Sequence, residues 1–534
     1  MRTRCQFALL LLCLLSVRAG NAADLDSIGE VSFPASADAQ TLEHFHRGLA
    51  YLHNFGWKQA RYEFQRARAL EPGFAMAYWG EAMSWLPLLQ TEGDLTRPRM
   101  ILENLGPDQA SRLTKAPTAL EKGFLLALDA YLYTPGDALA RRQALLSSME
   151  SLLVSQGPQA ETLAWCSLAL LSVALEADTG ERSALREKAA AYARDLTAQN
   201  PLHPGAVHYL LHSLSTPELA NQGLEAAERY RELAPLVSHA RHMPTHIYLL
   251  LGQWDRVAEM NENAFYTARA LWEPGDSPAD QNHILDWGQY GDLQMANYAA
   301  AEDWIVRAED TLQQNPGDGE TVRMLSRLKA RYIIESQQWE ALPVSANSSD
   351  DALLAAGLSA VAMRDLALAS LANQELKQRL ARSPDNLTLQ LLSLELDAAI
   401  LAAAGEDAQS REIFQQAITL FHKHGNQEGL PEPLKPLQEL YGETLLRAGQ
   451  PRLARDQFLG SLQTYPRRPL SLLGLARSYV DSKEPLKANE YYRLLLDNWG
   501  ERNFIGFSEA RTHLSLYDPE AVSTDAAHDD AVGF

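Results

Sequence analysis

Cysteine is scarce in this sequence, and its placement excludes several kinds of site. The chain has three cysteines in 534 residues, and Cys5 and Cys13 both lie near the N-terminus. Without that segment Cys166 has no partner for an internal disulfide, and a zinc site built on thiolates is excluded. Cys166 lies in the apolar run TLAWCSLALL. This setting indicates a small side chain buried in a helix and no activated nucleophile.

Apolar runs long enough to cross a membrane are also missing. The N-terminal run Phe7 to Leu15 follows Arg2 and Arg4 and precedes the small residues Gly20 and Ala22. This order is typical of a cleavable export signal, and the run is too short for a comfortable membrane span. We expect residues 1–22 to be a signal peptide, and the mature protein to be exported to the periplasm without a membrane span.

Positive charge is in deficit. The 47 lysines and arginines face 68 aspartates and glutamates, which gives a formal net charge of −21. Removing residues 1–22 takes away three arginines and no acid, so the mature chain carries −24. Such an acidic chain argues against nucleic acid as a partner.

Strand signals are scarce as well, whereas Ala, Leu, Glu, Gln and Arg recur at helical spacing. The sequence therefore predicts an all-α fold. Two regions resemble the 34-residue tetratricopeptide repeat, in which small residues let two helices pack closely around an aromatic side chain. The residues at the repeat offsets are Gly48, Tyr51, Ala60, Phe64, Ala67 and Pro72 near the N-terminus, and Gly442, Leu445, Ala454, Phe458, Ser461, Pro466, Ala476, Tyr479, Ala488 and Tyr492 near the C-terminus.

Weaker copies of the repeat lie between these regions, so the helical hairpins should stack into a superhelix with a concave groove. Residues 23–340 are predicted to form an N-terminal tetratricopeptide-like array and residues 353–516 a C-terminal one. The polar, serine-rich residues 341–352 are predicted to link them. The acidic, aperiodic residues 517–534 are predicted to be a disordered tail.

Histidine, by contrast, is concentrated in one part of the chain. Seven of the fourteen histidines lie between residues 203 and 283. His208 and His212 are four residues apart, as are His242 and His246, so each pair should stand on one face of one helix. The second pair follows the first by one 34-residue period, which predicts that the pairs lie on adjacent helices.

The register of the repeat predicts which way these side chains point. His239, His242 and His246 take the positions that line the concave surface in proteins of this repeat family. One copy further on, the same positions are taken by His283, Asp286 and Tyr290. Asn261 stands where the repeat usually has a large aromatic residue, and a buried amide requires hydrogen-bond partners.

These side chains predict a divalent transition-metal site in the groove. Neutral imidazole suits zinc, copper and iron, and the set could hold one ion or two. Tyr290, Asn261 and His203 are expected to support the ligands or to face a substrate. The candidate ligands are His208, His212, His239, His242, His246, His283 and Asp286.

The strings HPGAVHYLLH, HARHMPTHIYLLLGQWD and HILDWGQYGDLQ resemble a group of bacterial tetratricopeptide proteins that carry HPGAxHYxxH and HMPxHI motifs. The resemblance implies the fold and the location of the site, and it implies no settled activity. The chain departs from the group after the first histidine pair, where Ser215 stands in place of an acid.

The sequence leaves three functions open. One is a metal-dependent enzyme acting on a small molecule or peptide, and a second is a periplasmic metal-handling protein. The third is a metal-free scaffold that binds a protein or peptide partner, or an acidic ligand, in its polar groove. An enclosed pocket over the histidines would favour the enzyme, and an open groove would favour the scaffold.

Overall fold

A computed structural model describes residues 27–90, 92–424, 429–499 and 504–518. Within these ranges the chain is helical and has no strand, which confirms the predicted all-α fold. None of the helices in this part of the chain is both long and apolar enough to cross a membrane. The predicted signal peptide 1–22 and residues 519–534 of the predicted tail lie outside the described residues.

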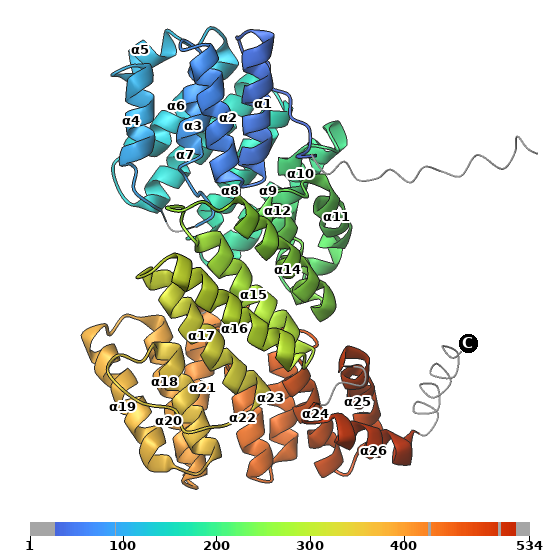
Figure 1. Cartoon of the computed structure of the whole chain (residues 1–534). Coiled ribbons are helices and arrows are strands. Elements are labelled where there is room, and N and C mark those ends of the chain that lie inside the picture. Colours follow the sequence, from blue (N-terminus) through green and yellow to red (C-terminus); the bar gives the residue numbers. More distant parts are fainter. Residues whose placement is uncertain (1–26, 91, 425–428, 500–503, 519–534) are drawn as a thin grey trace, which may run out of the picture.

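Nearly every helix packs against the next along the chain, and many alternate helices also touch, as in a stack of helical hairpins. Figure 1 shows α1 to α7 at one end of the stack, α18 to α26 at the other and α10 to α17 between them. The helices are α1 (Ala39–His53), α2 (Trp57–Leu70), α3 (Ala75–Met83), α4 (Thr96–Leu105), α5 (Gln109–Leu113), α6 (Ala119–Tyr133), α7 (Ala138–Gln156), α8 (Ala160–Ala174), α9 (Thr179–Gln199), α10 (Pro204–Leu214), α11 (Ala220–Leu233), α12 (Ser238–His242), α13 (Thr245–Leu250), α14 (Trp254–Leu271), α15 (Ala279–Gln294), α16 (Tyr298–Gln314), α17 (Gly319–Ser336), α18 (Asp350–Ala362), α19 (Leu366–Arg382), α20 (Leu387–Ala403), α21 (Asp407–His424), α22 (Leu437–Arg447), α23 (Pro451–Thr464), α24 (Pro469–Asp481), α25 (Pro485–Trp499) and α26 (Phe507–Tyr517).

Glycines let the first hairpins close around one aromatic ring. Phe64 of α2 is fully buried between Gly48 of α1 and Gly80 of α3. A Cβ atom at Gly48 would lie 2.7 Å from the Phe64 ring, and one at Gly80 would lie 2.3 Å from it. The spacing of small and aromatic residues in the sequence therefore reflects a direct contact between helices.

The C-terminal array repeats this packing. Phe458 of α23 lies between Gly442 of α22 and Gly474 of α24, where added Cβ atoms would lie 2.8 Å and 2.2 Å from its ring. Pro72 and Pro466 each follow the end of the second helix of a hairpin, α2 and α23, by two residues. Both end regions thus have the predicted tetratricopeptide architecture.

The segment around the predicted linker joins two helices that pack on each other. Residues 337–349 contain no helix, and α18 begins at Asp350, inside the predicted linker 341–352. Ile334 of α17 and Leu353 of α18 share one hydrophobic core. The stack of helices therefore continues across this segment. At the far end, α26 extends to Tyr517.

Substituting Gly80 by alanine tests the close packing around Phe64. The added Cβ cannot fit without displacing the ring, so we expect Gly80→Ala to lower the free energy of unfolding by about 1–3 kcal/mol. Urea unfolding measures the change. Gly73→Ala is the control, because a Cβ added to this exposed glycine would meet no heavy atom within 4 Å. Equal effects of the two substitutions would contradict the packing argument.

Candidate metal centre

The two histidine pairs come from adjacent parts of the stack, but only the first lies on a single helix. His208 and His212 both belong to α10, whereas α12 ends at His242 and α13 carries His246. The expectation of one continuous helix for the second pair is therefore wrong. Pro244 has no N–H to continue the hydrogen-bond ladder, yet its φ of −56° and ψ of −25° remain helical, so the two rings still meet.

His208, His212 and His239 form a cluster that we call the first trio. The Nε2 atom of His208 lies 3.1 Å from Nε2 of His212 and 3.1 Å from Nε2 of His239. One ligand atom from each residue lies within 4.8 Å of the others. Two of these side chains come from α10 and one from α12.

His242, His246 and His283 form the second trio. The Nε2 atom of His242 lies 3.1 Å from Nε2 of His246 and 2.9 Å from Nε2 of His283, which α15 contributes. These ligand atoms also lie within 4.8 Å of one another. The second trio therefore has the same arrangement as the first, one repeat further along the stack.

The spacing of the nitrogens fits a shared cation. Two imidazole nitrogens bound to one tetrahedral ion at about 2.0–2.1 Å lie about 3.3 Å apart. The observed separations within both trios are 2.9–3.1 Å between His208 or His242 and its two neighbours. Only a small outward movement of the rings would admit an ion.

Hydrogen bonds on the far side of the central rings fix which nitrogen faces inward. His208 Nδ1 donates to the backbone carbonyl of His53 at 2.6 Å, and His242 Nδ1 donates to Asn261 Oδ1 at 2.7 Å. The Asn261 amide is oriented in turn, because its Nδ2 donates to the Val257 carbonyl at 2.7 Å. Each central histidine therefore directs the lone pair of Nε2 into its trio. Asn261 thus lies in hydrogen-bond contact with His242, and its supporting role toward a metal ligand stays a prediction.

Burial keeps the histidines in the neutral form that binds metal. It lowers the pKa of His208 and of His246 to about 3. Burial, followed by repulsion from neighbouring imidazoles, also holds the pKa values of His212, His239 and His242 well below 6.5. Near neutral pH these lone pairs are therefore available to a cation.

Aromatic side chains form the apolar walls of the site. The Phe55 ring centroid lies 4.5 Å from that of His208 and 5.0 Å from that of His239. On the other side, the Trp287 ring lies 4.3 Å from His246. These contacts exclude water from one side of each trio and contribute to the low pKa values.

The site is nevertheless open to solvent on its outer side. The central rings of His208 and His242 are buried, with exposed fractions of 0% and 1%. His212, His239 and His246 are half-buried, and His283 is exposed. The trios also adjoin each other, because the ring centroids of His212 and His246 are 6.1 Å apart. The structure thus shows one extended histidine cluster made of two adjoining trios.

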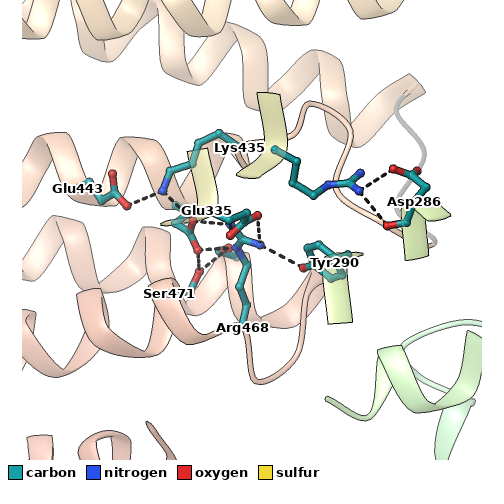
Figure 2. A network of polar contacts seen from close by, with 10 residues as sticks. Asp286, Tyr290, Glu335, Lys435, Glu443, Arg468 and Ser471 are labelled. Atoms are coloured by element: carbon teal, nitrogen blue, oxygen red, sulfur yellow. Dashed lines mark hydrogen bonds and ion pairs between the residues drawn. The ribbon is translucent and has the colours of Figure 1, made fainter. Parts of the chain in front are cut away.

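Two predicted site residues are not among the ligand atoms that converge in either trio. The Asp286 carboxylate pairs with Arg331 at 2.6 Å and with Arg327 at 3.3 Å, so it is not among the converging ligand atoms. The Tyr290 hydroxyl accepts a hydrogen bond from Arg468 at 3.1 Å. Figure 2 shows both residues in a polar network that joins α15 to the C-terminal array. They support the helix that carries His283.

His203 belongs to a third cluster that the sequence did not reveal. Its Nε2 lies 3.1 Å from Oε1 of Glu161, and His53 Nε2 lies 3.0 Å from Oε2 of the same carboxylate. His53 and Glu161 come from α1 and α8, far outside the repeat register of the other histidines. The sequence signal for this cluster was weak: Glu161 is an acid at the head of an otherwise apolar helix.

Cys166 is the small buried side chain that the sequence predicts. It is 0% exposed and free, and it belongs to the core of the N-terminal array. Burial raises the pKa of its thiol to about 12. A thiolate at neutral pH is therefore disfavoured, which excludes Cys166 as a nucleophile.

Solved structures are similar to this chain at low sequence identity. No family model and no curated relative matches the sequence. Among solved structures it is similar to the Cut9–Hcn1 hetero-tetramer of the APC/C, with 14% identity, 92% of this chain and 86% of that chain covered, and a TM-score of 0.39. It is also similar to a human IFIT1 dimer with m7Gppp-AAAA, with 13% identity, 87% of this chain and 96% of that chain covered, and a TM-score of 0.34. For yeast Tom70 the identity is 14%, the coverage is 91% of this chain and 96% of that chain, and the TM-score is 0.28. Because these values are low, the fold assignment rests on the helix packing of this chain.

The depressed histidine pKa values predict acid sensitivity of the metal-free protein. The unfolded chain binds protons below pH 6.5, whereas folded His208 stays neutral down to a pKa of about 3. The free energy of unfolding is therefore highest, as far as these histidines are concerned, above pH 6.5. It falls as the pH decreases, by about 1.4 kcal/mol per pH unit for each such histidine. Urea unfolding between pH 7 and pH 5 should show a shallower loss for His208→Gln than for the unmodified chain. Identical slopes would contradict the assignment of His208 as a buried neutral ring.

Proposed function

We propose that this tetratricopeptide-type scaffold holds two divalent transition-metal ions, one in each histidine trio. The observation that carries the proposal is the convergence of three Nε2 atoms in each trio. The central ring has its Nδ1 proton already committed to an oxygen, and its single Nε2 lone pair can accept only one N–H. Two further imidazoles stand within 3.1 Å of that lone pair, an arrangement that a shared cation explains.

Three protein ligands per ion suit a reactive site better than a purely structural one. A tetrahedral ion held by three imidazoles keeps a fourth position for water or substrate, and a bound cation can activate that water or polarise the substrate. Exposed His283 gives a solvent route to the second trio. These features support binding of a small molecule or peptide at the metal, as a metal-dependent enzyme requires, whereas the openness of the site is the feature that favours a scaffold.

The ligand set narrows the choice of metal. All six ligand atoms are imidazole nitrogens, and the nearby carboxylate of Asp286 is held by two arginines. A site of neutral nitrogens favours zinc, copper or iron over magnesium and calcium, which prefer oxygen ligands. The export signal in residues 1–22 would place this chemistry in the periplasm, and we include that location in the proposal.

The central histidines provide the direct test of the proposed function. We expect the unmodified protein, purified without a histidine tag, to contain about two transition-metal ions per chain, since each trio holds one. His208→Ala and His242→Ala should each remove about one ion, because each deletes the central ligand of one trio. Elemental analysis by mass spectrometry measures both values.

His422→Ala is the matched control, because this exposed histidine of α21 lies outside both trios. Its metal content should equal that of the unmodified protein. Metal content that is unchanged in His208→Ala and His242→Ala would overturn the proposal.

Asn261 offers a second test, because it touches no ion. Asn261→Leu removes the acceptor that directs His242 Nε2 inward, so we expect the affinity of the second trio for zinc to fall by about 10- to 100-fold. Asn263→Leu, on the exposed side of the same helix, serves as control. Competition with a chromogenic chelator measures the affinity. If both variants bind zinc like the unmodified protein, Asn261 has no supporting role.

A further inference from the structure

The third cluster of ionisable side chains lies directly behind the first trio. We call it the Glu161 cluster, formed by His53, Glu161 and His203, which are 0%, 2% and 0% exposed. The Glu161 carboxylate contacts both imidazoles and also accepts a hydrogen bond from Trp165 Nε1 at 3.0 Å. A Cβ at Gly205 would lie 2.9 Å from His53 Nδ1, so the glycine of the HPGA string allows α10 to approach this cluster closely.

The hydrogen bonds indicate that the Glu161 cluster is not a third metal site. An ion on Nε2 of His203 would move the ring proton to Nδ1, which is buried and has no hydrogen-bond partner among the described residues. A buried donor without a partner costs about 1–3 kcal/mol. With the proton on Nε2, His203 donates to Glu161 and only a lone pair is left without a partner.

A buried carboxylate holds the cluster together. The Tyr209 hydroxyl lies 2.7 Å from His53 Nδ1 on the other side of that ring. Burial alone would raise the pKa of Glu161, but His53 and His203 together hold it well below its usual range. All hydrogen bonds to this carboxylate in the described residues come from ring N–H groups, and none comes from lysine or arginine.

His53 connects this buried anion to the first trio. Its ring donates to Glu161, and its own backbone carbonyl accepts the proton of His208 Nδ1. The residue that the carboxylate holds in place therefore also holds the central metal ligand. A cation in the first trio would gain a central ligand whose orientation a fully buried carboxylate holds through His53.

The second trio lacks this buried carboxylate. A neutral amide, that of Asn261, supports its central ring. The carboxylate of Asp286, one helical turn beyond His283, is already paired with two arginines. His283 itself is exposed, whereas every member of the first trio is buried or half-buried.

We infer that the two proposed ion sites are unequal, and that Glu161 is the positioning residue that makes the first trio the tighter one. The first trio fills first and retains its ion. The second trio binds more weakly, exchanges its ion with solvent and presents the coordination position that a substrate reaches. This inference rests on the proposed function, because it requires both trios to bind metal.

Zinc titration of the full-length, metal-free protein tests the inference by calorimetry. The unmodified chain should bind in two steps of different affinity. His212→Ala should abolish the tighter step, and His283→Ala should abolish the weaker one. Glu161→Gln should weaken the tighter step by about 10- to 100-fold and leave the weaker step unchanged, a selective effect that general loss of structure would not produce.

Glu395→Gln is the matched control, because Glu395 is also a fully buried glutamate but lies on α20 of the C-terminal array. It should leave both steps unchanged.

Two equal steps in the unmodified protein, or equal weakening of both steps in Glu161→Gln, would overturn the inference while leaving the two metal sites in place. A third bound ion that is lost in Glu161→Gln would also overturn it. If Glu161→Gln does not fold, the His212→Ala and His283→Ala titrations still decide whether the sites are unequal. No zinc binding by the unmodified chain would overturn the proposed function itself.

Discussion

The position of one proton on each central imidazole is the constraint on which the candidate metal centre depends. A neutral histidine has one N–H and one lone pair, and the ring can serve a metal only if the inward nitrogen keeps the lone pair. The carbonyl of His53 and the amide of Asn261 impose that choice on His208 and His242. The other rings of each trio therefore converge on an Nε2 atom, of His208 or of His242, that keeps its lone pair.

The fold supplies the geometry that this constraint needs. Stacked hairpins bring histidine side chains of α10, α12 and α15 into contact, so that residues one repeat apart in sequence become neighbours in space. Both arrays brace the last of these helices, because Arg331 of α17 contacts Asp286, and Arg468, which directly precedes α24, binds Tyr290 together with the buried carboxylates of Glu335 and Glu439. A metal site at the centre of the stack thus depends on contacts from both arrays.

The sequence predicted the parts of this arrangement that follow the repeat period. The all-α fold, the glycine-to-aromatic packing around Phe64 and Phe458 and the closeness of the two histidine pairs all come from regular spacing. The division into two trios could not be predicted from spacing. It depends on which histidine of the next helix contacts each pair, and this is His239 for the first pair and His283 for the second.

Other features depend on contacts that spacing does not encode. Asp286 has a concave-surface position in the repeat, but its carboxylate forms ion pairs with two arginines of α17. The break at Pro244 is a local backbone effect within an otherwise regular copy. His53 and Glu161 are 108 residues apart and belong to helices of different register, so only the folded chain brings them together behind His208.

X-ray diffraction from crystals of the metal-loaded protein, recorded at the absorption edge of the bound metal, tests the central claim most directly. We expect two anomalous peaks per chain. One should lie about 2.0–2.1 Å from Nε2 of each histidine of the first trio, and the other should lie equally close to those of the second trio. Metal-loaded crystals with no anomalous peak at either trio, or with the metal bound only elsewhere on the chain, would contradict it.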